Sequence, residues 1–268
     1  MGGARYDRYR ASISNTVSTA TVPGSADQTV GFTSVRLGTI YQPTPQQSVY
    51  VSYSTSFNPS LEQLVNTTGG TQPLPPERNR SYELGSKWDL LDGNLSGTAA
   101  VFRITKYNAR SQNTDGSYSA TGTVQVDGAR AGLSGRVTKK LQVFAAYTYL
   151  DAEIVDAIAV GTQGRVPANT PTNSASLWST YAISPEWEIG GGVNYVGARY
   201  ANNTDTVRVG SYARLDALVA YHQPKYDVRL NLLNLANRLY YDALIPSDGG
   251  RAVPGIGRTA MLSVDYHF

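Results

Sequence analysis

The residues of this chain that could do acid–base chemistry are few. It has two histidines, His222 and His267, and no cysteine. A hydrolytic site would need one of these histidines with serine or aspartate in reach. Without cysteine there is no thiolate and no disulfide framework. Asp, Glu and His side chains do not recur at metal-ligand spacing, so we expect no metal site and no resident cofactor.

A second group of chemically capable residues consists of charges that alternate with apolar neighbours, so that they would face inward, toward the lumen, if the chain forms a barrel. Arg5 and Asp7 follow this pattern, as do Arg36, Glu83, Lys87, Arg103, Arg214, Asp216, Asp227 and Arg229. One interpretation is that these charges hold a plug or line a channel. The other is that opposite charges form ion pairs across neighbouring strands, such as Arg214 or Asp216 with Asp227 or Arg229. We favour pairing because opposite signs occur side by side.

The elements that position these charges are strands, and residues 257–268 are the clearest of them. Ala260, Leu262, Val264, Tyr266 and Phe268 fall on one face, and mostly polar residues fall on the other. This period of two indicates a strand. An apolar outer face that meets lipid and an aromatic final residue are typical of the closing strand of an outer-membrane barrel. Taken alone, the segment also fits a half-buried strand of a soluble sandwich.

The rest of the chain decides between these two folds. About twelve strands are predicted, at 3–16, 32–41, 49–57, 82–90, 95–110, 122–137, 141–150, 173–183, 187–200, 212–222, 226–235 and 257–268. Turns of a few residues alternate strictly with loops of roughly ten to twenty residues, as in barrels with short periplasmic turns and long extracellular loops. A sandwich would scatter its connection lengths. We therefore predict one all-β domain over residues 1–268, an antiparallel transmembrane β-barrel in the bacterial outer membrane.

Composition agrees with this prediction. The 19 tyrosines suit a membrane-interface belt, and the net charge of +3 points to no nucleic-acid partner. No apolar run approaches the roughly 18 residues of a transmembrane helix. The start, MGGARYDRYR, has no hydrophobic signal core, so we expect an engineered product or the later part of a longer precursor. Both histidines would lie near the periplasmic rim, away from the outer face where barrel enzymes work, so no enzyme is expected.

Several motifs resemble the carboxy-terminal half of TonB-dependent siderophore receptors, especially the catecholate type. They are PERNRSYELGSK at 76–87, VDG at 126–128, GGGVNYVG at 190–197, NLLNLANRLYY at 231–241 and the final strand. The resemblance implies a barrel of about 22 strands around a plug domain, which imports ferric siderophore with energy from the TonB complex. This chain departs from that pattern because we find in it no plug, no TonB-contacting segment and only about half the strands.

The resemblance also directs attention to the long loops and upper strand ends as the ligand site. An anionic, aromatic ferric catecholate would favour arginine with tyrosine around it. The candidates are Arg165, Arg199, Tyr200, Arg208, Tyr240, Tyr241 and Arg251, although the three tyrosines also fit an interface belt. Tyr266 and Phe268 are expected to form the signal for the barrel assembly machinery.

Two further interpretations stay open. The chain could be a self-contained twelve-stranded passive pore, or a soluble β protein with adhesive loops. Unpaired strand edges in hydrocarbon would each cost several kcal/mol. If the chain folds alone, we therefore expect a closed barrel in which residues 4–10 pair with residues 260–266.

Overall fold

A computed structural model of the protein describes residues 1–14, 25–61, 74–112, 118–157, 159–245 and 251–268. These residues form one antiparallel sheet of twelve strands and two small two-stranded sheets. The large sheet contains β1 (Gly2–Ser14), β2 (Ser25–Thr44), β3 (Gln47–Asn58), β4 (Glu77–Leu90), β5 (Leu95–Gln112), β6 (Tyr118–Arg136), β7 (Leu141–Asp156), β8 (Asn173–Ala182), β9 (Trp187–Val196), β12 (Tyr212–Gln223), β13 (Tyr226–Leu233) and β16 (Thr259–Tyr266). The predicted all-β fold with twelve strands is confirmed.

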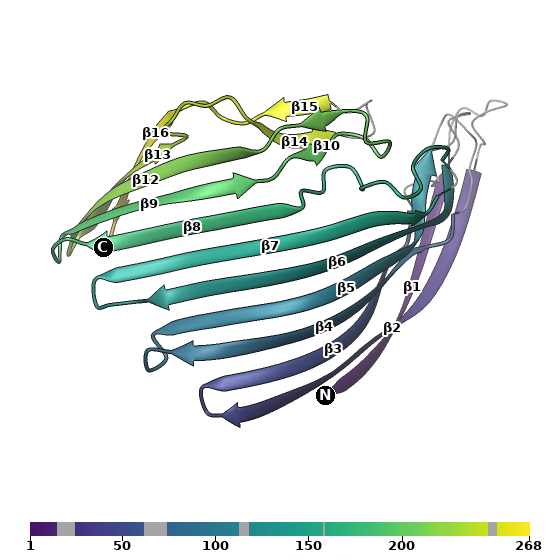
Figure 1. Ribbon diagram of the computed structural model, residues 1–268, viewed down its shortest axis with the longest axis horizontal. Helices are drawn as coiled ribbons and strands as arrows, with labels where there is room; N and C mark the ends of the chain where they lie inside the picture. Colours follow the sequence, from purple (N-terminus) through teal and green to yellow (C-terminus); the bar gives the residue numbers. More distant parts are fainter. Residues whose placement is uncertain (15–24, 62–73, 113–117, 158, 246–250) are drawn as a thin grey trace.

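The strands of the large sheet lie side by side in chain order and form a curved wall (Figure 1). The two small sheets are inserted into long connections. One pairs β10 (Arg199–Tyr200) with β11 (Arg208–Val209), and the other pairs β14 (Tyr241–Ile245) with β15 (Arg251–Pro254). The sequence did not predict these hairpins, because strands of two to five residues are too short to display alternation.

The connections alternate in length along the chain, as predicted. Those at 45–46, 91–94, 137–140, 183–186 and 224–225 contain two to four residues. The others, at 15–24, 59–76, 113–117, 157–172, 197–211 and 234–258, contain five to twenty-five residues. The turn between β4 and β5 contains an Asp-Gly pair, and Leu91, Asp92 and Gly93 all have positive φ. All short turns therefore lie at one end of the wall and all long connections at the other.

Several strands extend beyond their predicted ends toward the long connections. β2 begins at Ser25, whereas the sequence predicted its start at residue 32. The predicted loop at 111–121 is mostly strand, because β5 continues to Gln112 and β6 starts at Tyr118. The predicted loops 17–30, 58–79, 111–121 and 236–256 lie partly outside the described residues. Strands that rise above a membrane no longer face lipid, and their alternation becomes too weak to read from the sequence.

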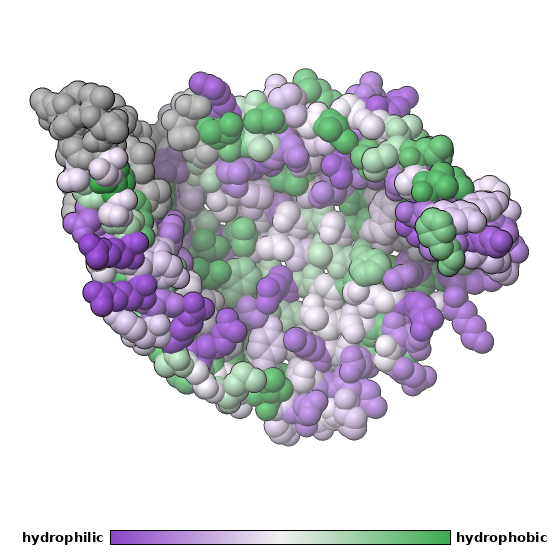
Figure 2. Space-filling model, turned by 180° about the vertical axis from the view of Figure 1, so that it is seen from behind, coloured by the Kyte–Doolittle hydropathy of each residue, from purple (hydrophilic) through white to green (hydrophobic). Residues whose placement is uncertain are grey.

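The two faces of the wall differ in chemistry. Residues paired across strands share a face, so Leu37, Tyr53 and Tyr82 lie together, as do Thr39, Val51 and Leu84. This convex face exposes large apolar side chains, among them Leu37, Val51, Tyr82, Leu84, Val101, Leu177, Leu215, Leu262 and Val264. Glu83, in register with Ser52, lies on the opposite, concave face. Figure 2 shows the hollowed side, with hydrophilic residues along both of its edges.

Glycines on the concave face let neighbouring aromatic rings lie flat on the wall. A Cβ atom at Gly85 would collide with the Tyr50 ring, one at Gly128 with the Phe102 ring, and one at Gly192 with Trp178 and the Leu177 carbonyl oxygen. Gly192, within the run Gly190–Gly192, thus allows close packing of a ring against the backbone. Glycine kinks are also a known means of bending a sheet, so these glycines favour the curvature of the wall.

The predicted closure of the barrel is wrong. β1 and β16 are the two ends of the sheet, and residues 4–10 do not pair with residues 260–266. Figure 1 places the two strands at opposite ends of the curved wall. The wall curves too little over twelve strands to bring its edges together (Figure 1).

Candidate functional site

The concave face carries a hydrogen-bonded charge cluster around Glu83. One carboxylate oxygen of Glu83 accepts bonds from the Tyr50 hydroxyl at 2.5 Å and from an Arg130 guanidinium nitrogen at 2.7 Å. The Lys87 ammonium lies 5.7 Å from the centre of the Tyr50 ring. Strands β3, β4 and β6 supply these residues, so the cluster joins three strands across the inner wall. Glu83 and Lys87 lie on the predicted face, and their interactions support the pairing interpretation.

The inner wall of β12 and β13 carries two further ion-pair groups. Arg214 and Asp216 pair within β12 at 3.0 Å. Near the short turns, Asp227 contacts His222 at 2.7 Å, and His267 and Arg229 at 3.3 and 3.6 Å. We predicted pairing between β12 and β13 for the arginines and aspartates, but the register places Arg214 far from Arg229. Arg214 pairs within β12, and Arg229 pairs with Asp227 within β13 and with Asp265 of β16 at 3.7 Å. Both histidines lie at the end of the wall that carries the short turns, as predicted.

Arg103 is the exception among the predicted inward charges. It lies in register with Tyr82 on one side and Asp127 on the other, and so occupies the convex face. Its guanidinium donates two bonds to Asp127, at 2.6 and 2.8 Å. The prediction of a lumen position for Arg103 is wrong. The pair lies toward the long connections, beyond Val101 and level with Tyr82, where the outer surface leaves the apolar band and can carry charge.

Asn234 organises the long connection between β13 and β16. Its side-chain amide donates to the carbonyl oxygens of Arg238 and Ile256 at 2.9 and 3.0 Å, and its Oδ1 accepts from the Arg238 amide at 3.1 Å. Its own amide donates to Asp216 at 2.9 Å. The residue is 1% exposed and has φ of 50°. The NLLNLANRLYY motif therefore contains Asn234, whose hydrogen bonds fix one long connection to the wall.

Beside Asn234 lies a cluster of arginine and tyrosine side chains at the outer end of β9 and β12. Arg199, 4% exposed, donates to the Tyr241 and Asp242 carbonyl oxygens at 3.0 and 2.7 Å. Tyr240, 5% exposed, stacks on Tyr212 with ring centres 4.6 Å apart, and its hydroxyl accepts from Arg214 at 3.3 Å. The Tyr212 hydroxyl bonds to Asp242 at 3.3 Å.

The remaining ligand candidates lie outside that packed cluster. Tyr200 and Arg208 are register partners in the β10–β11 hairpin, and Tyr241 and Arg251 belong to the β14–β15 hairpin. Arg165 lies in the connection between β7 and β8, where its carbonyl oxygen accepts from Ile154. Arg165, Arg208, Tyr241 and Arg251 are exposed. The structure thus brings Arg199 and Tyr240 together with Tyr241 and places the others around the same end of the wall.

Sequence reasoning missed Arg130, Tyr50 and Asn234. Arg130 is surrounded by glycine and alanine on both sides, and small residues on both faces conceal the alternation that would mark it. Tyr50 was assigned to no face. Asn234 could have been found, since asparagine is the residue other than glycine that most readily adopts positive φ.

The structure also locates the aromatic residues at the carboxy terminus. Tyr266 ends β16 on the convex face, opposite Tyr226, and its ring packs edge-on against Phe268 at 5.2 Å. Across the described ranges, no three His, Cys, Asp or Glu side chains gather as metal ligands would. None of the described segments is a helix of the length and apolarity needed to cross a membrane.

Comparison with known proteins identifies the family. A family model described as TonB dependent receptor-like, beta-barrel matches residues 1–235. The probable TonB-dependent siderophore receptor PiuA of Acinetobacter baumannii is 32% identical over 99% of this chain and 38% of its own length. The catecholate siderophore receptor Fiu of Escherichia coli is 30% identical over 87% of this chain and 32% of its own length.

Solved structures agree with the sequence matches. The crystal structure of PiuA superposes with a TM-score of 0.87 at 32% identity and covers 99% of this chain and 40% of that one. The closed form of Fiu gives a TM-score of 0.81 at 27% identity, over 100% of this chain and 42% of that one. The chain thus spans about two fifths or less of its relatives' lengths. It belongs to the family of TonB-dependent receptor β-barrels.

Proposed function

We propose that this chain forms part of the wall of an outer-membrane receptor that takes up ferric siderophore of the catecholate type. The observation that carries the proposal is the similarity to PiuA, a probable siderophore receptor, along 99% of the chain. The apolar convex face would contact the lipid bilayer, and the concave face would line the path of the ligand. A plug and the TonB energy-transducing complex would complete the transporter.

The outer end of the wall is where the ferric chelate would first bind. Arg165 and Arg208 supply exposed guanidinium groups, Tyr200 is the register partner of Arg208, and Tyr241 supplies an exposed ring in the β14–β15 hairpin. An anionic catecholate complex combines charge with aromatic surface, and guanidinium and phenol groups complement both. Arg199 and Tyr240 would act indirectly, since they hold β10, β12 and β14 together beneath that surface.

The proposal assigns the chain no catalytic role, and the other interpretations have less support. A twelve-stranded passive pore would need β1 and β16 to pair, which they do not in the described sheet. A soluble adhesive protein would not expose a continuous apolar convex face. Tyr266 and Phe268, at the end of the last strand, would serve recognition by the barrel assembly machinery.

Uptake by cells that express the gene encoding this chain tests the proposal. We expect the double variant R165A/R208A to raise the ferric catecholate concentration for half-maximal uptake about a hundredfold, because two charge-assisted contacts are lost and each contributes about 1.5 kcal/mol or more. The control is K139A/K225A, which removes equal charge at the short turns and should leave uptake unchanged. The proposal would be contradicted if the wild type took up no ferric catecholate. It would also be contradicted if R165A/R208A and K139A/K225A took it up equally well.

A further inference from the structure

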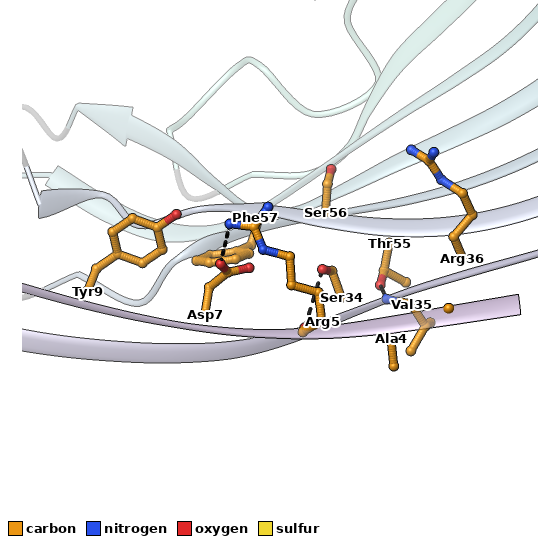
Figure 3. Close-up of a pocket in the computed structure, with 11 residues that line it drawn as sticks. Ala4, Arg5, Asp7, Tyr9, Ser34, Val35, Arg36, Thr55, Ser56 and Phe57 are labelled. Carbon is orange, nitrogen blue, oxygen red and sulfur yellow. Dashed lines mark hydrogen bonds and ion pairs between the residues drawn. The ribbon is translucent and has the colours of Figure 1, made fainter.

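The outer ends of the strands are joined differently at the two ends of the wall. Near β1, the pairing of β2 with β3 stops at Arg36 and Ser54, and a hollow of about 520 Å³ lies beside the break (Figure 3). Arg5 and Asp7, which line this hollow together with Arg36, form an ion pair at 2.6 Å. Near β8 and β9, in contrast, hydrogen bonds join the long connections that carry the candidate ligand residues.

The β10–β11 hairpin, which carries Arg208, is closely bonded within itself. The amide of Ala201, which is 0% exposed, donates to the Val207 carbonyl oxygen at 2.8 Å. The Asn202 side chain closes the tip, because its amide donates to the Thr206 hydroxyl at 2.7 Å and its Oδ1 accepts from the Thr206 and Val207 amides at 3.2 and 3.4 Å. The backbone of Arg208 is therefore placed by the position of the whole hairpin.

The backbone around Arg165, in the connection between β7 and β8, is held from two sides. The Arg165 carbonyl oxygen accepts from the amide of Ile154, a buried residue of β7, at 2.8 Å. On the other side, the Val166 amide donates to Asp205 Oδ2 at 3.2 Å. Asp205 thus ties the residue next to Arg165 to the hairpin that carries Arg208.

Two further bonds join the same two segments. The Ala168 amide donates to Asn203 Oδ1 and the Asn169 amide donates to the Tyr200 carbonyl oxygen, both at 2.8 Å. Among these three bonds, the one to Asp205 lies nearest to Arg165 in the chain. Asp205 has a φ of 58°, and its Oδ1 is buried without a hydrogen-bond partner among the described residues. The contact therefore uses one acceptor oxygen, which asparagine at the same φ would also supply.

We infer that Asp205 is a positioning residue, which holds Arg165 and Arg208 at a fixed separation before the ferric chelate binds. A preorganised site binds more tightly because less conformational freedom is lost on binding. On the far side of the hairpin, Arg199 donates to the Tyr241 and Asp242 carbonyl oxygens, so β14 lies beside β10 and joins the same body (Figure 1). The inference rests on the proposed function, which assigns Arg165 and Arg208 to the chelate.

Two variants at position 205 separate the hydrogen bond from the backbone conformation. D205G permits positive φ but removes the acceptor, whereas D205N keeps both. In cells that express the gene encoding this chain, we expect D205G to raise the ferric catecholate concentration for half-maximal uptake about fivefold, at an unchanged maximal rate. Loss of one hydrogen bond corresponds to a change of about this size. D205N should match the wild type, as should the control T204A, whose hydroxyl bonds to Thr206 within the hairpin.

A double-mutant cycle shows whether Asp205 acts through Arg165. If it does, D205G should have little further effect in the R165A background, because the group that it positions is already absent. A fivefold effect of D205G in both backgrounds would overturn the inference, since Asp205 would then act independently of Arg165.

The distance between the two segments can be measured without ligand, because the chain has no cysteine of its own. Spin labels at Q163C and V207C in protein purified in detergent should give a narrow distance distribution that D205G broadens and D205N does not. An unchanged distribution in D205G, or unchanged half-maximal uptake while R165A/R208A is impaired, would overturn the inference alone. Absence of ferric catecholate uptake by the wild type would overturn the proposed function and this inference with it.

Discussion

Replacing Asn234 with leucine is expected to lower the free energy of unfolding by about 3 kcal/mol or more. The substitution leaves the Arg238 and Ile256 carbonyl oxygens without their donor and the Arg238 amide without its acceptor. Each such buried group costs about 1–3 kcal/mol when unpaired. Leucine is also a poor residue at a φ of 50°. In a protein of this size, the thermal unfolding midpoint in detergent should fall by roughly 6–12 °C, as followed by circular dichroism.

Asn237 provides a matched control three residues away. It also has positive φ, at 48°, but it is exposed and its side chain accepts a single bond, from the Arg258 amide at 2.9 Å. We expect N237L to lower the midpoint by less than half as much as N234L. N234D, which keeps the acceptor and loses the donors, should fall between them. Equal midpoints for N234L and N237L would show that Asn234 does not hold the connection.

Introducing arginine at Val51 is expected to impair membrane insertion, whereas arginine at the next residue is not. Val51 is 57% exposed on the convex face, between Thr39 and Leu84, and Ser52 is on the concave face beside Glu83. Arginine in the middle of a lipid-facing surface costs about 2–4 kcal/mol, whereas lumen positions tolerate charge. V51R should therefore reduce the amount of folded protein in outer membranes, and S52R should leave it near the wild-type level.

For the wild type and each variant, we measure the amount of protein in outer membranes that stays folded in mild detergent when the sample is not heated. A loss for S52R equal to or larger than the loss for V51R would place the lipid on the other face. Equal expression of the unfolded chains is the control for synthesis.

Local sequence features predicted much of this fold. Alternation in β3, β4, β12, β13 and β16 identified their faces, so Glu83, Lys87, Arg214 and Asp227 were placed on the concave side from the sequence alone. The strict alternation of connection lengths gave the strand count and the position of the short turns. Both features depend only on neighbouring residues, which a single sequence displays directly.

The remaining features depend on distant parts of the chain. Closure failed as a prediction because the curvature of twelve strands is a sum over the whole wall, to which each residue contributes little. Arg103 was assigned to the wrong face because the apolar residues Phe102 and Ile104 flank it, and only its register with Tyr82 shows which side is outside. The environment of Arg36 required knowing that β2 and β3 separate beside it.

We expect the convex face to contact lipid and the concave face to contact water. Single cysteines at each of residues 49–54 in β3 test this expectation most directly, because the chain has no cysteine of its own. In outer membranes, we expect a water-soluble maleimide to label positions 50, 52 and 54 rapidly and positions 49, 51 and 53 slowly. A lipid-confined quencher should give the reverse order with fluorescent labels. Rapid aqueous labelling of positions 49, 51 and 53, or equal labelling at all six, would contradict the account.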